Sequence, residues 1–148
     1  MIATDGILEI VLRNDLGEAD RLAAAVEGFC DDQDVPPRAA YHLNLVLDEL
    51  MTNIVSYGYD EGNGRQEIRI RLRREPSAVQ VQVEDDGRPF NPLEVPPPDL
   101  DAPVETRPIG GLGIHFLRTL MDDLCYRREN ERNRLCFKKL LPQEGTAA

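Results

Sequence analysis

Glu49 and Asn53 lie one helical turn apart in a segment with a helical pattern of apolar residues. On a helix, side chains four residues apart lie about 40° apart around the axis. A carboxylate can polarise an attacking hydroxyl, and an amide oxygen suits Mg²⁺, which otherwise keeps waters and substrate phosphates. The pair could therefore orient a nucleophile and hold a metal ion. Each residue alone is also common at the solvated edge of an apolar stripe.

A second acidic position follows a strand-like segment. Asp85 comes where the alternation of Val79, Val81 and Val83 ends, and Gly87 follows two residues later. A carboxylate at a strand end can accept a hydrogen bond from the exocyclic amine of adenine, and glycine lets the backbone pass close to the base. An ordinary Asp-Gly turn has the same pattern. This segment therefore indicates a nucleotide site only in combination with others.

Small residues open the last helical segment. Gly110, Gly111, Leu112 and Gly113 directly precede the apolar run that begins at Ile114. Small residues at a helix start expose backbone N–H groups, and the positive end of the helix dipole favours phosphate oxygens. A flexible helix cap would have the same composition. The three segments together, in this order along the chain, predict a site that holds Mg-ATP.

The elements that position these segments follow from the apolar patterns. Period-two alternation predicts strands over residues 7–12, 66–73, 78–83, 124–128 and 134–140. Spacing of three and four residues predicts helices over residues 16–30, 38–56 and 114–124. We therefore expect an α+β fold: a two-layer α/β sandwich whose mixed, mostly antiparallel sheet carries helices on one face. A single domain over residues 7–141 and a C-terminal tail over residues 142–148 are expected.

A proline-rich segment separates the acid from the glycines. Residues 89–108 hold seven of the eleven prolines and show no apolar periodicity. Long irregular stretches inside compact domains are usually functional or mobile, so we expect a lid over the site at about residues 87–112. Arg88 and Arg107 lie near its two ends and could neutralise phosphate charge.

Composition excludes several classes of protein. The net charge of −10 over 148 residues argues against binding to nucleic acid or to an anionic membrane surface. Three widely spaced cysteines without a CxxC pair indicate reduced thiols and a cytoplasmic location. The only lysines are Lys138 and Lys139, which excludes a Walker P-loop and the eukaryotic protein-kinase site. No signal peptide and no membrane span are expected.

Taken together, these segments resemble the GHKL (Bergerat-fold) superfamily of gyrase, heat-shock chaperone, histidine-kinase and mismatch-repair ATPases. The pair Glu49 and Asn53 resembles its N box, and the two glycine-containing segments that follow resemble its first and second glycine boxes. The branch that the chain resembles is that of the bacterial anti-sigma-factor serine/threonine protein kinases. The resemblance covers roughly residues 7–140 and implies the same Bergerat fold.

The resemblance also implies roles for individual residues. Glu49 would be the catalytic base, Asn53 the Mg²⁺ ligand and Asp85 the residue that reads adenine. Gly87 would lie against the base, and the glycines of the second box would contact the phosphates. ATP and Mg²⁺ are the implied cofactors. The implied protein is a homodimeric switch that binds a sigma factor and phosphorylates a small anti-sigma-factor antagonist protein.

Two positions depart from the family pattern. Pro89 replaces the second glycine of the first box and has no N–H donor. Ile109 occupies the place of the basic residue before the second box, so that Arg107 is the nearest cation. These departures leave open a non-catalytic ATP-binding module that regulates a partner by contact alone. A histidine-kinase fragment fits less well, because these 148 residues show no long helical pair with a phosphoacceptor histidine.

Overall fold

The computed structural model describes residues 2–4, 6–57, 67–94 and 111–142. The strands are β1 (Ile2–Thr4), β2 (Ile7–Arg13), β3 (Glu67–Glu75), β4 (Ala78–Asp85), β5 (Asp122–Glu129) and β6 (Arg132–Leu140). The helices are α1 (Ala19–Asp32), α2 (Pro37–Tyr57) and α3 (Gly111–Leu120). Two short 3-10 helices are η1 (Leu16–Glu18) and η2 (Pro92–Glu94). No helix in these described ranges is long and apolar enough to cross a membrane.

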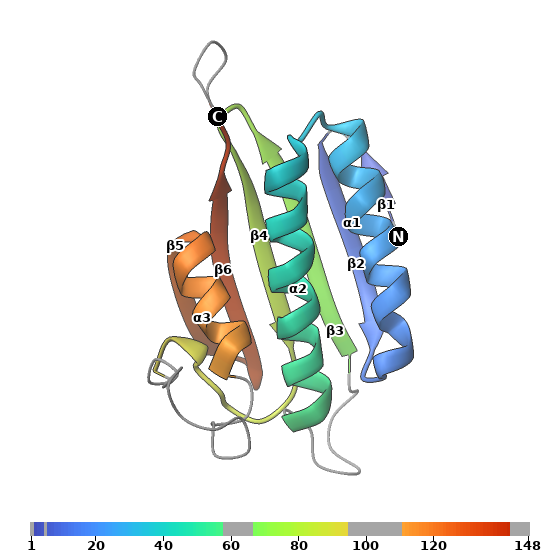
Figure 1. The fold of residues 1–148 in the computed structure, drawn as a ribbon. Coiled ribbons are helices and arrows are strands. Elements are labelled where there is room, and N and C mark those ends of the chain that lie inside the picture. Colours follow the sequence, from blue (N-terminus) through green and yellow to red (C-terminus); the bar gives the residue numbers. More distant parts are fainter. Residues whose placement is uncertain (1, 5, 58–66, 95–110, 143–148) are drawn as a thin grey trace.

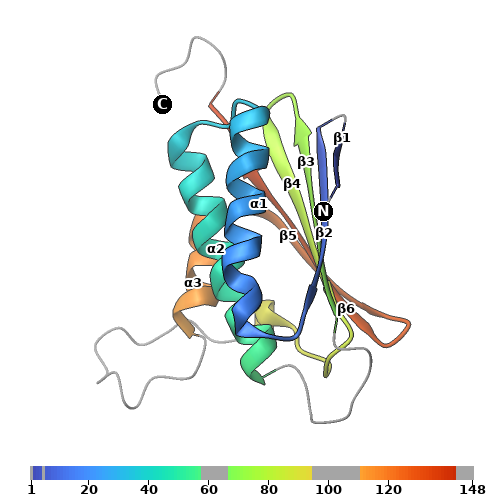
Figure 2. The same cartoon turned by 90° about the vertical axis from the view of Figure 1, so that its right-hand side faces the viewer.

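The six strands form one sheet in the order β1-β2-β3-β4-β6-β5, and the three helices cover one of its faces (Figures 1 and 2). The predicted two-layer α+β fold is confirmed. Each pair of neighbouring strands in the described residues is antiparallel, so the sheet is not mixed. The short strand β1 was not predicted, because its three residues are too few to show an alternation.

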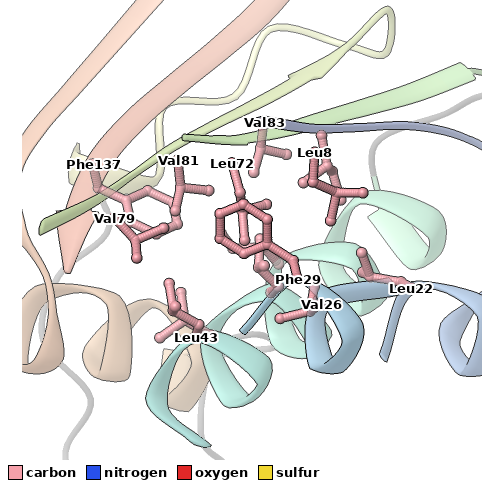
Figure 3. Packing of buried hydrophobic residues seen from close by; sticks show 14 of the residues in the cluster. Leu8, Leu22, Val26, Phe29, Leu43, Leu72, Val79, Val81, Val83 and Phe137 are labelled. Carbon is pink, nitrogen blue, oxygen red and sulfur yellow. The ribbon is translucent and has the colours of Figure 1, made fainter. Parts of the chain in front are cut away.

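Alternation along the strands separates the two faces of the sheet, as predicted. In β3, Ile68, Ile70 and Leu72 are buried, whereas the arginines between them are exposed. The buried side chains meet the apolar stripes of α1 and α2. Figure 3 shows Val26 and Phe29 of α1 packed towards the sheet. Burying one such side chain contributes about 1.5–3 kcal/mol, so this core holds the helices in place against the strands.

The start of the first helical region is capped by an aspartate. Asp15 Oδ1 accepts a hydrogen bond from Gly17 N at 2.9 Å, at the start of η1, which leads into α1. After α1 ends, Asp34 has a positive φ of 53°, which breaks the helix. Pro37 then opens α2, where its missing N–H would have had no partner.

The third helix ends earlier than the sequence pattern predicted. The expected helix over 114–124 stops at Leu120, and β5 already begins at Asp122. Asp123 has a φ of 52°, which a right-handed helix does not allow, and the β5–β6 register shifts beside it. Lys139 Nζ donates to the carbonyl oxygen of Leu120 at 3.1 Å and so satisfies the helix end.

The hairpin that joins β5 and β6 is tighter than expected. The predicted strands over 124–128 and 134–140 leave five residues between them, but only Asn130 and Glu131 connect β5 and β6. Both have positive φ values, 51° and 63°, as a two-residue type I′ turn requires. Because the turn is short, β6 begins earlier than predicted. Asn133 is therefore part of β6 and pairs with Asp85 of β4.

Candidate nucleotide-binding site

Three segments that are distant in sequence meet at one end of the sheet. These are the last turns of α2, the end of β4 and the start of α3 (Figure 1). Between them lies a cavity of about 350 Å³, here called the site cavity. Its volume falls within the range of about 300–1,000 Å³ that is typical of small-molecule sites.

The walls of the site cavity are mostly apolar, with a few polar groups. The apolar lining includes Leu50, Ile54, Val83, Phe90, Ile114 and Leu135. The polar lining residues are Asn53, Asp85, Arg88, Tyr126 and Asn133. A mostly apolar cavity with a few hydrogen-bonding groups suits a ring system such as a nucleotide base.

Asn53 brings a side-chain amide from α2 to the wall of the site cavity. Its Nδ2 atom is buried and has no hydrogen-bond partner in the described residues. A buried polar atom without a partner is costly, and O and N of an amide are assigned from their partners. This amide therefore fits a site that a polar ligand or a metal ion completes. Glu49, one turn earlier, is partly buried but does not line the site cavity.

Asp85 places a buried carboxylate at the end of β4, with only 7% of the residue exposed. Its Oδ1 accepts hydrogen bonds from Gly87 N at 2.9 Å and from Asn133 Nδ2 at 3.0 Å. Burial raises the pKa of the Asp85 carboxyl, and these two hydrogen bonds partly oppose that rise. Both bonds use Oδ1, so Oδ2 is the oxygen that could accept a hydrogen bond from an exocyclic amine.

Asn133 is a residue of the site that the sequence analysis missed. Besides Asp85, its Nδ2 donates to the carbonyl oxygen of Arg88 at 2.7 Å. Its Oδ1 accepts hydrogen bonds from Phe90 N at 3.2 Å and from the hydroxyl of Tyr126. The sequence contained a signal for this role, because Asn133 is a polar residue in the inward-facing series that continues with Leu135 and Phe137. A polar residue at a core position requires partners.

The loop after β4 is fastened at several points. Arg128 Nη1 donates to the carbonyl oxygen of Gly87 at 2.8 Å, and Arg118 Nη2 donates to that of Leu93 at 2.6 Å. Gly87 is buried and is not among the residues that line the site cavity. Arg88 and Pro89 both line the site cavity. The first part of the predicted lid is thus a fixed wall of the site cavity.

The glycine segment forms the first turn of α3. Gly111, Leu112 and Gly113 are helical, and the next residue, Ile114, lines the site cavity. The N-terminus of α3 therefore lies beside the site cavity, as phosphate binding requires. Gly110, Arg107 and the part of the predicted lid over 95–110 lie outside the described residues.

Comparison with known proteins agrees with this geometry. Residues 12–139 match the histidine kinase-like ATPase domain family, and the chain belongs to this family. The chain is 36% identical over 86 residues to the serine-protein kinase RsbW of Bacillus mycoides, covering 55% of this chain and 52% of that protein. It is 30% identical over 98 residues to the serine/threonine-protein kinase BtrW of Bordetella bronchiseptica, covering 66% of this chain and 68% of that protein. The chain spans about half the length of the RsbW relatives it matches. The resemblance to GHKL ATPases and to these kinases is confirmed.

Proposed function

We propose that this chain is an ATP- and Mg²⁺-dependent protein serine/threonine kinase that acts as an anti-sigma-factor switch. In this proposal it phosphorylates a small antagonist protein, binds a sigma factor, and works as a homodimer in the cytoplasm. Support comes from relatives that are named as serine and serine/threonine kinases. Further support comes from the family match, which covers most of the described fold.

One observation carries the proposal: Asn53 of α2 and Asp85 of β4 line the same site cavity beside the start of α3. The base of ATP would lie in the apolar part, with its exocyclic amine donating to Asp85 Oδ2. The phosphates would extend towards the N-terminus of α3, where backbone N–H groups point outwards. In this proposed arrangement the γ-phosphate would lie near the turn of α2 that carries Glu49.

The proposed reaction is transfer of the γ-phosphoryl group to a serine or threonine hydroxyl of the partner protein. The hydroxyl oxygen forms a bond to the γ-phosphorus, and the bond from that phosphorus to the β–γ bridging oxygen breaks, releasing ADP. Glu49 would orient the hydroxyl and take its proton. The chain's own contribution is mainly positioning, because phosphoryl transfer needs alignment and charge neutralisation more than covalent catalysis.

Mg²⁺ fits the Asn53 position. Nδ2 of this amide is buried without a hydrogen-bond partner among the described residues, and an amide turned the other way would present its oxygen there. An amide oxygen is a hard ligand of the kind that Mg²⁺ accepts. When bound there, the ion supplies charge neutralisation between the phosphates. Asn53 would hold it from the protein side, and Arg88, on the same cavity wall, would add a positive charge.

A second candidate function is a non-catalytic ATP-binding module that regulates its partner by contact. Two observations favour it: Glu49 does not line the site cavity, and Pro89 offers no N–H at the cavity wall. In that case ATP binding would change the affinity for the partner, with no phosphoryl transfer.

Labelled-ATP transfer to proteins that co-purify with the chain distinguishes the two functions. We expect a labelled serine or threonine on a small partner. Glu49→Gln should bind ATP like the parent protein and transfer no label. Asp48→Asn is the matched control, because Asp48 is the exposed neighbour of Glu49. Transfer by Glu49→Gln at the parent rate would remove Glu49 as base, and no transfer by the parent would favour the contact-only module.

A further inference from the structure

Two cysteines lie directly opposite each other on the face of the sheet away from the three described helices. Cys125 of β5 pairs with Cys136 of β6 in the antiparallel ladder. Cys136 alternates with the buried Leu135 and Phe137, so its side chain points away from the core. Cys125 is exposed, Cys136 is half-buried, and both are free thiols.

We propose that Cys125 and Cys136 form a redox-active dithiol site, which a peroxide-class oxidant converts into an intramolecular disulfide between β5 and β6. This site is separate from the site cavity, and it does not depend on the function proposed above. Neither sulfur has a place in ATP binding or in phosphoryl transfer.

The backbone geometry is compatible with such a bond. The residue pair that closes the two-residue turn is hydrogen-bonded, and hydrogen-bonded and non-hydrogen-bonded pairs alternate along the ladder from there. Cys125 and Cys136 are therefore a hydrogen-bonded pair, for which the Cα–Cα distance is about 5.5 Å. This lies inside the range of about 4.4–6.8 Å found for disulfides. The Cβ atoms of opposite residues lie about 4.5–5.5 Å apart, whereas a disulfide brings them to about 3.5–4.5 Å. The strands must therefore approach each other slightly.

The position of Cys125 in the edge strand allows that approach. Among the described strands β5 pairs with β6 alone, and its register shifts between Asp122 and Cys125. An irregular ladder gives the backbone room to adjust beside Cys125. A disulfide that is exposed and somewhat strained is readily reduced. The site is therefore built for a reversible bond and not for a permanent structural one.

The two thiols differ in a way that assigns their order of reaction. Cys125 is the more accessible, so its thiolate is the one that attacks a peroxide oxygen. The O–O bond breaks, hydroxide leaves, and Cys125 becomes a sulfenic acid. The sulfur of Cys136 then attacks that of Cys125, water is released, and the disulfide forms. In sum, two thiols and one hydrogen peroxide give one disulfide and two waters.

Nearby charges and burial agree with Cys136 as the second thiol. Burial raises the pKa of the Cys136 thiol, and Arg134 and Arg127 partly oppose that rise. Cys136 is therefore less ionised than an ordinary cysteine thiol, and it reacts second, with the sulfenic acid of Cys125. The third cysteine serves as an internal reference, because Cys30 is only 2% exposed and burial raises its pKa to about 11.

Peptide mapping of the intact protein tests the proposal. The reduced full-length chain is treated with hydrogen peroxide and then unfolded in urea, so that every free thiol, including Cys30, can be alkylated. The protein is then digested with trypsin without reductant. Arginines between the two cysteines place them on separate peptides, 119–127 and 135–138. We expect these peptides to be joined after oxidation and separated by dithiothreitol, while Cys30 stays alkylated.

Variants and mixed labelling complete the test. Cys136→Ser should accumulate a sulfenic acid on Cys125 that dimedone traps, whereas the parent protein should accumulate none. A mixture of ¹⁵N-labelled and unlabelled chains should give joined peptides of a single isotope composition. Joined peptides of mixed composition, or irreversible oxidation of Cys125 with Cys136 still free, would overturn the proposal.

Discussion

Asn133 and Asp85 face each other across the β4–β6 ladder, and Asn133 Nδ2 donates a hydrogen bond to Asp85 Oδ1 at 3.0 Å. The same amide group also holds the carbonyl oxygen of Arg88 and the N–H of Phe90. One side chain of β6 therefore positions both the carboxylate and the first residues of the loop after β4. A binding group supported in this way loses little freedom when a ligand arrives.

Asn133→Ala should lower both stability and ATP affinity. It removes the hydrogen bonds that Asn133 makes to Asp85 Oδ1, to the carbonyl oxygen of Arg88 and to the N–H of Phe90. Leaving a buried polar atom unsatisfied costs about 1–3 kcal/mol. We expect the free energy of unfolding to fall by at least about 1 kcal/mol and the Kd for ATP to rise. Urea unfolding and calorimetric titration measure the two quantities. Asn44→Ala is the control, because Asn44 makes one hydrogen bond to its own helix; equal effects of both changes would contradict the role of Asn133.

Asp85→Asn should weaken nucleotide binding through the loss of one acceptor. The amide keeps Oδ1 for Gly87 and Asn133 but presents N–H groups where Oδ2 stood. A hydrogen bond to a charged group contributes about 1.5–3 kcal/mol, so we expect about 10- to 100-fold weaker ATP binding. Glu84→Gln is the matched control, because Glu84 is the preceding residue and forms ion pairs with Arg132 and Arg134 of β6. If the two variants bind ATP equally well, Asp85 does not read the base.

Asp85→Asn should raise the stability of the protein, although it weakens ATP binding. Burial raises the folded-state pKa of Asp85, so between the ordinary aspartate pKa and the raised value the folded state binds more protons than the unfolded state. Stability contributed by this group is present at low pH and is lost as pH rises through that window. Asp85→Asn removes the titration. At neutral pH the variant should therefore unfold at higher urea concentration than the parent protein.

Unfolding curves measured from acidic to neutral pH check this expectation. The parent protein should lose stability relative to Asp85→Asn as pH rises, and the difference should be constant once Asp85 is ionised. A parent protein that gains stability relative to the variant over this range would show that the folded state lowers this pKa. Stability and ATP affinity moving in opposite directions would identify Asp85 as a group kept for binding at a cost in stability.

Much of the fold could be predicted because its signals are local. The alternation of Ile68, Ile70 and Leu72 with arginines specifies which side of β3 is buried. The end of α3 could not be predicted from the pattern of apolar residues, because it depends on contacts in the folded protein. Apolar spacing continues past Leu120, but Asp123 adopts a positive φ and the chain turns into β5. A pattern of apolar residues contains no information about such a backbone change.

The site was predictable only in part, for a related reason. Asn53 and Asp85 belong to motifs with recognisable spacing, and the structure brings both to one cavity. Asn133 lies 48 residues beyond Asp85, and its contribution depends on strand register. Register is fixed by the two-residue turn at Asn130 and Glu131. A one-residue error in that turn would place Asn133 on the other face of the sheet.

Asn53→Ala should separate metal binding from base binding. If Asn53 holds Mg²⁺, its removal weakens ATP binding in Mg²⁺, whereas binding of metal-free ATP in EDTA should change little. Changes in the shell around a metal site typically cost about 10- to 100-fold in metal affinity, so we expect at least about a tenfold loss. Calorimetric titration of the parent and the variant in both buffers measures the difference.

Two further variants sharpen this test. Asn53→Asp restores an oxygen ligand and should recover ATP binding in Mg²⁺. In EDTA its negative charge repels the phosphates and should weaken binding below that of the parent protein. Thr52→Ala is the matched control, because Thr52 Oγ1 donates a hydrogen bond to the carbonyl oxygen of Asp48 within its own helix at 2.8 Å. Equal losses for Asn53→Ala in the two buffers would mean that the unpartnered amide of Asn53 contacts the nucleotide itself, and the metal ligand would then have to be sought elsewhere in the chain.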